Sequence, residues 1–230
     1  MDKKRVAVSF SGKDSTLALY DLLHSHEYEV KLLFSTVTDG FNRTSIHGVR
    51  EELLEAQAES IGLPLQKIRI PEQCSNEIYG SIMKRELASM KELGIDHIAF
   101  GDLFLEDVRN YREEMLKPVG MTPVFPLWGI NTTELIERFL SLGFRTITTC
   151  VDLTQLPEDF SGREINRHFL EELPKGVDPC GENGEFHSFV FDGPIFKKPI
   201  HFKIGEKKLS DDIYTGQTRF CFTDLIAIKI

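Results

Sequence analysis

The chain has 230 residues, of which 41% are hydrophobic and 27% are charged. A chain of this length and composition can bury a core without disulfides or a structural metal, which excludes a mainly disordered protein. The net charge of −9 at pH 7 disfavours nucleic-acid binding, because a phosphate backbone is also negative. The sequence contains no apolar signal segment and no apolar stretch long enough to cross a bilayer. We therefore expect a soluble, cytoplasmic protein with no membrane partner.

Four cysteines are spread along the chain without a C-x-x-C pair or a histidine cluster at zinc-finger spacing. We expect reduced thiols and no structural metal. Cys150 and Cys180 have no basic neighbour in sequence that would lower the pKa of a thiol, so we expect small buried or inert thiols there rather than nucleophiles.

The first 151 residues alternate between strand-like and helix-like segments. Short apolar runs predict strands at residues 6–8, 32–37, 68–70, 98–100 and 144–151. Apolar residues at helical spacing predict helices around residues 18–23, 54–61, 83–90 and 135–139. Asn131 and Glu134 have the spacing of a capping box, and Gly143 is expected to end that last helix. This alternation predicts an α/β fold with a doubly wound, mainly parallel sheet.

Beyond residue 152 the chain becomes rich in proline and hairpin-like segments. Apolar runs at residues 186–191, 200–204 and 220–230 predict strands. One helix is expected over residues 161–173, with Ser161 and Glu164 as its capping box. We therefore place a domain boundary at residue 151 and expect a smaller α+β domain over residues 152–230.

The turns that follow parallel strands are the first candidates for a binding site, because such sheets bind ligands at the carboxyl ends of their strands. Three turns qualify, at residues 9–14, 38–39 and 101–102. The first joins a strand to a helix, where backbone N–H groups and the helix dipole attract an anion. It is not a Walker A loop, because Ala7 replaces the first glycine and Asp14 follows Lys13. The alternative is an ordinary helix start with Asp14 near the N-cap.

This first turn resembles the S-G-G-x-D-S signature of the PP-loop ATP pyrophosphatases, with the single Gly12 where that signature has two glycines. The resemblance implies ATP and Mg²⁺ as cofactors. It also implies catalytic roles for Lys13, which would neutralise pyrophosphate, and Asp14, which would hold Mg²⁺. We expect both side chains to lie in an exposed loop. Together with the turn at residues 101–102, the expected ATP-binding residues are Ser9, Ser11, Gly12, Lys13, Asp14, Ser15, Gly101 and Asp102.

A longer block, Gly181 to Pro194, resembles the G-E-x-G-E-[YF]-H-[ST]-x-V-x-D-G-P block of the diphthine-ammonia ligase family. His47 also matches that family in residue type. Further similarity to its bacterial-type members lies in Phe100-Gly101-Asp102, Glu106, Arg109, Tyr111-Arg112, Glu113 and Pro126-Leu127-Trp128. The resemblance implies that residues 1–151 form a PP-loop ATP-binding domain with an adenine-nucleotide alpha-hydrolase-like, Rossmann-like fold. Residues 152–230 would then form an acceptor-binding domain.

The family resemblance implies a reaction. ATP activates a carboxylate as an acyl-adenylate with release of pyrophosphate, and ammonia then displaces AMP to leave an amide. In archaeal and eukaryotic members the carboxylate belongs to diphthine, a modified histidine on an elongation factor. Whether the acceptor here is such a protein residue stays open. The 230 residues leave no room for a glutaminase unit, so ammonium is the expected nitrogen donor.

Within the longer block, carboxylates can hold an ammonium ion and a histidine can accept its proton. The expected substrate-binding residues are Glu182, Asn183, Glu185 and His187, and the last two are also expected to be catalytic. The alternative is a polar hairpin rim followed by an ordinary turn at Asp192-Gly193. For His47 and His97 a structural role and a functional role stay equally open.

Two other functions remain as alternatives. One is a PP-loop enzyme that modifies tRNA, against which the acidic charge and the lack of a C-x-x-C pair weigh. The other is a non-catalytic adenine-nucleotide-binding protein, against which Lys13-Asp14 and the charged C-terminal block weigh. The sequence does not decide whether the chain forms a homo-oligomer.

Overall fold

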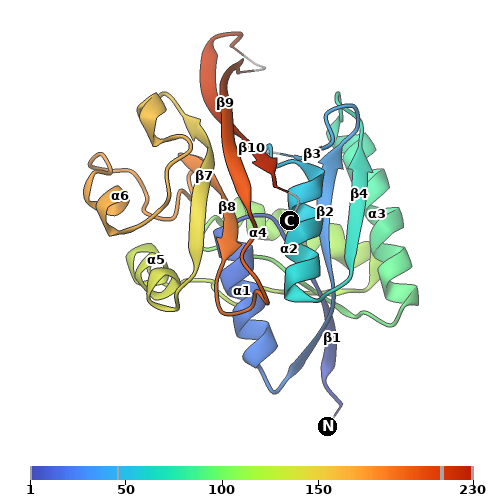
Figure 1. Ribbon diagram of the computed structural model, residues 1–230. Coiled ribbons are helices and arrows are strands. Elements are labelled where there is room, and N and C mark those ends of the chain that lie inside the picture. Colours follow the sequence, from blue (N-terminus) through green and yellow to red (C-terminus); the bar gives the residue numbers. More distant parts are fainter. Residues whose placement is uncertain (1, 46, 213–214, 229–230) are drawn as a thin grey trace. The chain divides into compact units, whose positions relative to one another are not determined.

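The computed structural model describes residues 2–45, 47–212 and 215–228. The chain divides into two compact units (Figure 1). The first comprises Met1–Asn42 and Gly62–Ile130, and the second comprises Arg43–Ile61 and Asn131–Ile230. Residues 229–230, which end the last predicted strand, lie outside the described residues.

The first unit contains a parallel sheet, as the sequence predicts. Its strands are β1 (Lys4–Ser9), β2 (Tyr28–Thr38), β4 (Leu65–Ile70), β5 (His97–Ala99) and β6 (Thr122–Val124). Its helices are α1 (Lys13–His24), α3 (Asn76–Glu92) and α4 (Glu106–Leu116), followed by the 3-10 turn η1 (Lys117–Val119). The strands lie in the order β4-β2-β1-β5-β6, and every neighbouring pair is parallel. The chain therefore adds strands first on one side of β1 and then on the other.

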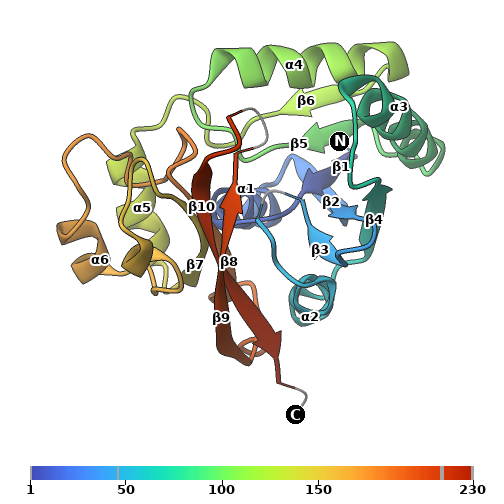
Figure 2. The same cartoon turned by 90° about the horizontal axis from the view of Figure 1, so that it is seen from above.

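Helices cover both faces of this sheet. Three consecutive residues of β1, Val6, Ala7 and Val8, are fully buried, which requires cover on both sides. Ala7 belongs to a core that includes residues of α3 and α4, which lie together on one face of the strands (Figure 2). Helix α1 contacts β1 and β2 and buries its own apolar side, including Leu19 and Leu22. The predicted doubly wound α/β fold is confirmed.

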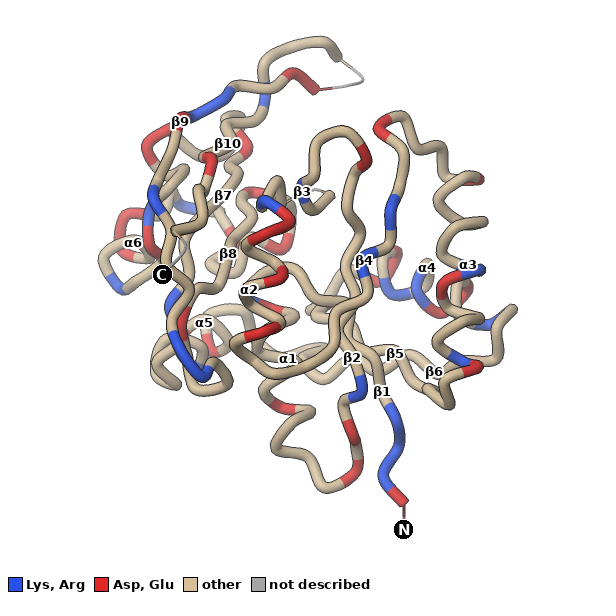
Figure 3. The backbone as a smooth tube through the Cα atoms, turned by 45° about the vertical axis from the view of Figure 1, so that its right-hand side comes forward, with Lys and Arg blue, Asp and Glu red and all other residues tan. Residues whose placement is uncertain are grey.

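Two elements of the first unit are absent from the sequence-based prediction. Strand β6 has three residues and includes Pro123, so its apolar run is too short to be recognised. Helix α4 carries charged residues of both signs (Figure 3), and Leu116 is its one fully buried residue. A helix with so narrow an apolar side gives a weak periodic signal.

The second unit contains an antiparallel sheet. The strands of this sheet are β7 (Arg145–Asp152), β8 (Phe186–Asp192), β9 (Phe202–Asp211) and β10 (Thr218–Ala227), and the unit also includes the two-residue strand β3 (Arg43–Thr44), which is not part of the antiparallel sheet. Its helices are α2 (Glu51–Ile61), α5 (Thr132–Ser141) and α6 (Arg167–Glu171), with the 3-10 turn η2 (Glu158–Phe160). The antiparallel strands lie in the order β8-β7-β10-β9. Leu53 of α2 packs in the same core as Ile147, Phe189 and Leu225.

The predicted strand at residues 144–151 forms as β7, but its assignment to the parallel sheet is wrong. It pairs antiparallel with β8 and β10. Seven of its eight residues are buried, and a strand buried on both faces looks like a parallel strand in sequence. The boundary in sequence is consequently not at residue 151, because the second unit already includes Asn131 and the whole of β7.

The helix predicted over residues 161–173 forms only over Arg167–Glu171, and its predicted capping box is wrong. Ser161 donates a hydrogen bond to the carbonyl oxygen of Cys221 at 3.1 Å, so it does not cap a helix. Glu164 forms an isolated β-bridge with Ile147. Helical structure is confined to α6, where the side chain of Asn166 accepts a hydrogen bond from the Phe169 amide. Hydrogen bonds to distant strands override the local capping pattern here.

The capping of α5 agrees with the prediction. The Oδ1 atom of Asn131 accepts hydrogen bonds from the amides of Thr133 and Glu134 at 2.9 and 3.2 Å. Gly143 follows the C-cap residue with a φ of +84°, the left-handed conformation that ends many helices. The chain therefore enters β7 from a well-defined helix end.

Candidate functional site

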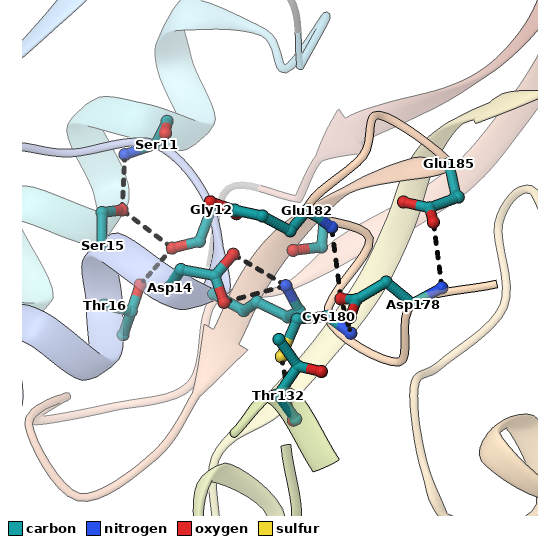
Figure 4. Close-up of polar contacts among 12 residues, drawn as sticks. Ser11, Gly12, Asp14, Ser15, Thr16, Thr132, Asp178, Cys180, Glu182 and Glu185 are labelled. Atoms are coloured by element: carbon teal, nitrogen blue, oxygen red, sulfur yellow. Dashed lines mark hydrogen bonds and ion pairs between the residues drawn. The ribbon is translucent and has the colours of Figure 1, made fainter. Parts of the chain in front are cut away.

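The turn from β1 to α1 carries the residues predicted to bind phosphate. Gly12 is the N-cap of α1 and offers no side chain to bond the amides of the first helical turn. The hydroxyl of Ser15 accepts a hydrogen bond from the Ser11 amide and donates one to the Gly12 carbonyl oxygen, both at 2.9 Å (Figure 4). Ser15 thus fixes the shape of the turn. Gly12 itself supplies no capping side chain to the positive end of the helix dipole, and helix termini of this kind can bind anions.

Lys13 and Asp14 form an ion pair in the first turn of α1. The Nζ atom of Lys13 lies 2.9 and 2.7 Å from the two carboxylate oxygens of Asp14. Lys13 is only 3% exposed, so the prediction that it lies in an exposed loop is wrong. A buried ammonium group needs an anionic partner. Asp14 is such a partner, and the phosphates of a nucleotide would be another.

The turn after β5 lies against the turn after β1, as neighbouring parallel strands predict. A Cβ atom on Gly101 would lie 2.5 Å from the amide nitrogen of Ser15 and 2.8 Å from the carbonyl carbon of Asp14. Only glycine permits two backbones to approach this closely. The structure therefore brings together two of the three predicted turns. In the third, Asp39 is exposed and lies 3.7 Å from Arg69.

Asp102 is the largely buried carboxylate of this site. Its Oδ2 atom lies 3.5 Å from the Nε atom of Arg112. Burial raises the pKa of Asp102 above its usual value, and the charge of Arg112 only partly opposes this effect. Among the described residues, neither of these two buried atoms has a hydrogen-bond partner.

In the second unit, the loop before β8 is held together by Glu185. The Glu185 side chain is buried, and its Oε1 atom accepts hydrogen bonds from the Asp178 amide at 2.9 Å and the Asn183 side-chain amide at 3.1 Å. Its Oε2 atom accepts one from the backbone amide of Asn183 at 2.9 Å. These contacts favour a positioning role for Glu185 and Asn183. Their predicted roles in catalysis and substrate binding stay predictions.

Asp178 also organises this loop and is missed by the sequence analysis. Its Oδ1 atom accepts hydrogen bonds from the amides of Cys180 and Glu182, at 2.8 and 3.3 Å (Figure 4). An aspartate that bonds the amide two residues ahead forms an Asx turn, and the sequence Asp-Pro-Cys-Gly is a turn signal of this kind. That signal could have identified the residue.

The structure brings His187 and His47 together within the second unit. Their ring centroids lie 4.7 Å apart. The Nδ1 atom of His47 lies 3.1 Å from the carbonyl oxygen of Ser188, and it must be the donor because a carbonyl oxygen only accepts. This contact with the residue next to His187 fixes the His47 ring. His97 lies in the first unit at the start of β5, where burial lowers its pKa.

The predicted magnesium ligand, Asp14, does not belong to a cluster of three or more metal-ligand side chains among the described residues. Among the described residues, no group of three or more histidine, cysteine, aspartate or glutamate side chains could hold a metal ion. Both oxygens of Asp14 contact Lys13, so this turn alone does not form a magnesium site. The role of Asp14 toward Mg²⁺ stays a prediction.

The expected burial of the Cys150 and Cys180 thiols is confirmed. Burial raises the pKa of Cys150 to about 12, so this thiol is protonated at neutral pH.

Within the described part of the chain, no helix is long and apolar enough to span a membrane.

Comparison with known proteins gives matches along most of the chain. Residues 3–123 match the family model described as "Diphthamide synthase N-terminal domain", and residues 131–218 match "Diphthamide synthase C-terminal domain". Proteins named "Diphthine--ammonia ligase" are similar: the one from Bos taurus is 28% identical over 167 residues, and the one from Homo sapiens is 27% identical. Each match covers 66% of this chain and 62% of the relative's length. The relative from Danio rerio is 28% identical over 191 residues, covering 75% of this chain and 74% of that protein.

The similar solved structures include a predicted subunit of a tRNA methyltransferase from Methanocaldococcus jannaschii. The match has a TM-score of 0.43 and 19% sequence identity, and it covers 86% of this chain and 100% of that chain.

Proposed function

Because the chain belongs to the diphthamide synthase family, we propose that it is a ligase that uses ATP to join ammonium to a carboxylate as an amide. The relatives named diphthine–ammonia ligase support this class of reaction. A protein-bound diphthine is accordingly the first acceptor to test, and small carboxylic acids are the second.

In the proposed reaction, a carboxylate oxygen of the acceptor attacks the α-phosphorus of ATP. The α–β phosphoanhydride bond breaks, and pyrophosphate leaves the acyl-adenylate. Ammonium loses one proton, its nitrogen attacks the acyl carbon, and the bond to AMP breaks. A second proton leaves the nitrogen as the amide forms. His187 is the proposed acceptor of a proton in this second half, because a neutral imidazole is the common general base near pH 7.

The observation that carries this proposal is the buried Lys13 at the N-terminus of α1, next to the glycine N-cap Gly12. A pyrophosphate placed on this turn would meet the positive end of the helix and the ammonium group of Lys13. Both would stabilise the negative charge that develops on the leaving group. Gly101 keeps the neighbouring backbone against the turn, so the charges are held in place before the reaction.

Mg²⁺ commonly accompanies ATP, held by the phosphates and one or two carboxylates. Asp14 is the carboxylate of this turn, and it would become available if Lys13 moved to the phosphates.

The test is the identity of the nucleotide products. We expect AMP and pyrophosphate when ATP, ammonium and the acceptor are supplied together. Replacing Lys13 with alanine should lower turnover by about 10²-fold, the usual cost of losing one preorganised charge contact. The control is Lys91→Ala, which also removes a lysine ion-paired to an aspartate, Asp96, but from an exposed position.

Formation of ADP and phosphate would contradict the proposal. Wild-type turnover in Lys13→Ala would contradict the assigned role of Lys13. Nucleotide binding without any cleavage would instead favour a non-catalytic adenine-nucleotide-binding protein.

A further inference from the structure

Two arginines of α4 stack on aromatic rings of the first unit. Arg109 and Arg112 are three residues apart and so lie on the same side of the helix. The guanidinium carbon of Arg109 lies 5.0 Å from the ring centroid of Phe125 and 4.7 Å from that of Trp128. The guanidinium carbon of Arg112 lies 4.9 Å from the ring centroid of Phe100. We call these five residues the arginine–aromatic stack.

The stack is continuous with the turn that carries Lys13. Phe100 lies in a stacked arrangement with Phe125, with ring centroids 5.8 Å apart, and immediately precedes Gly101. Gly101 in turn touches the backbone of Asp14 and Ser15. The amide of Gly129, next to Trp128, donates a hydrogen bond to the Leu103 carbonyl oxygen at 2.8 Å. The stack therefore lies at the carboxyl edge of the sheet, where ligands of such sheets bind.

The guanidinium group of Arg109 has one edge that can bind a ligand. Its Nε atom donates a hydrogen bond to Glu113 at 2.9 Å. Among the described residues of the first unit, this is its one hydrogen bond, and its side chain is 38% exposed. The two rings and the hydrogen bond to Glu113 hold the guanidinium group in position. The remaining edge, with both Nη atoms, has the fork geometry that binds a carboxylate or phosphate through two hydrogen bonds.

We propose that Arg109 binds the carboxylate of the acceptor substrate. This inference rests on the proposed amidation, and it names the residue that holds the group to be activated. The strand order reverses between β1 and β5, and the turn after β1 carries the groups suited to phosphate. The loops after β5 and β6, which carry the arginine–aromatic stack, lie on the other side of that reversal. An acceptor held there would face the nucleotide across the switch point of the sheet.

The single tryptophan of the chain makes the test direct. Trp128 is the only tryptophan, and it contacts Arg109, so its fluorescence reports on this guanidinium group. Acetate and succinate serve as carboxylate probes, and inorganic pyrophosphate serves as the phosphate probe. Each is titrated into the purified full chain at constant ionic strength, balanced with potassium chloride, without ATP. We expect a saturable change in Trp128 emission with the carboxylates.

Arg109→Gln should weaken carboxylate binding about tenfold or more, because it removes a charge-assisted hydrogen-bond pair. Arg109→Lys, which keeps the charge but loses the fork, should give intermediate binding. The matched control is Arg145→Gln: Arg145 also stacks on a ring, that of Phe191 at 4.8 Å, and also pairs with a glutamate. This control should titrate like the wild type. Circular dichroism confirms that each variant is folded.

Three outcomes would overturn the proposal: no carboxylate changes the emission, Arg109→Gln and Arg145→Gln weaken binding equally, or only pyrophosphate acts. In the last case Lys13→Ala should abolish the effect, and Arg109 would then serve the phosphates of ATP. Because the titration needs no turnover, a failed amidation assay leaves its result intact. The two hypotheses can therefore fail separately.

Discussion

Gly101 determines how closely two turns of the proposed ATP site approach each other. Its missing side chain lets the turn after β5 touch the first turn of α1. The family block around it identifies the position in sequence, but only the structure shows the reason for glycine. The backbone distances to Ser15 and Asp14 leave no room for a Cβ atom.

We predict that Gly101→Ala lowers ATP turnover at least about tenfold, because the added methyl group must push the two turns apart and misplace the charge contacts. Gly80→Ala is the matched control. Gly80 lies within α3, and a Cβ atom there would meet nothing within 4 Å. This control should keep full activity and equal or slightly greater stability, since alanine favours helices. Steady-state AMP release and thermal unfolding measure both effects. Equal activity in the two variants would show that the contact does not matter.

Glu185 gives a second prediction at this scale. In Glu185→Gln, one carboxylate oxygen becomes an NH₂ group that faces a backbone N–H donor. We expect a loss of about 1–3 kcal/mol in the free energy of unfolding, because a buried hydrogen-bonded group loses its partner. Urea denaturation measures the loss, and the exposed Glu171→Gln should change stability by less than about 0.5 kcal/mol. An unchanged midpoint in Glu185→Gln would mean that this carboxylate does not hold the loop.

Sequence alone identified the loop residues by type and by family resemblance, but not what each side chain contacts. Lys13 is a buried member of an ion pair, and Ser15 bonds within its own turn. The pairing of His187 with His47 joins segments that are far apart in sequence. Such contacts depend on the tertiary fold, which local spacing does not encode.

Among the elements, α2, β3 and β10 are linked by one carboxylate. Asp224 of β10 contacts the guanidinium groups of Arg43, in β3, and Arg50, which precedes α2, each at 2.7 Å. A hydrogen bond from Arg50, opposed by burial and reinforced by Arg43, lowers the pKa of Asp224 to about 2. The ionised side chain therefore stabilises the fold of the second unit.

This shift predicts a pH-dependent contribution. Because the pKa of Asp224 is lower in the folded chain than in the unfolded one, its stabilisation is complete above about pH 4 to 5 and is lost as the pH falls toward 2. Asp224→Asn should lower the free energy of unfolding by about 2 kcal/mol at pH 7. The difference from the wild type should shrink below pH 4. Urea titrations at several pH values test this, with the exposed Asp159→Asn as control. A difference that is constant between pH 7 and pH 3 would contradict the assignment.

Most strands and helices could be predicted from apolar periodicity, because their buried residues recur at regular spacing. The exceptions have physical causes. Helix α4 buries too little apolar surface, β6 is too short, and the S-x-x-E pattern at Ser161 is overridden by hydrogen bonds to β10. Strand β7 was recognisable as a strand, but its partners were not, since burial on both faces does not distinguish parallel from antiparallel pairing.

At the scale of the whole molecule, the fold class follows from the alternation of strands and helices in the sequence. Which segments belong to which unit does not follow from it. Residues 43–61 lie between β2 and β4 in sequence but belong to the second unit. Their contacts with distant residues, such as the hydrogen bond from Gln57 to the Val190 carbonyl oxygen at 2.6 Å, have no local signal. A boundary placed at residue 151 from composition therefore assigns residues 43–61 to the wrong unit.

The most direct test of the account is a crystal structure of the chain with a non-hydrolysable ATP analogue, because it needs no knowledge of the acceptor. We predict that the phosphates lie on the turn from Ser11 to Ser15, against the N-terminus of α1. We also predict that the Nζ atom of Lys13 leaves the carboxylate of Asp14, now 2.7 Å away, and contacts a phosphate oxygen. Phosphates bound away from this turn, or a Lys13 that stays on Asp14 while the phosphates are bound, would contradict the account.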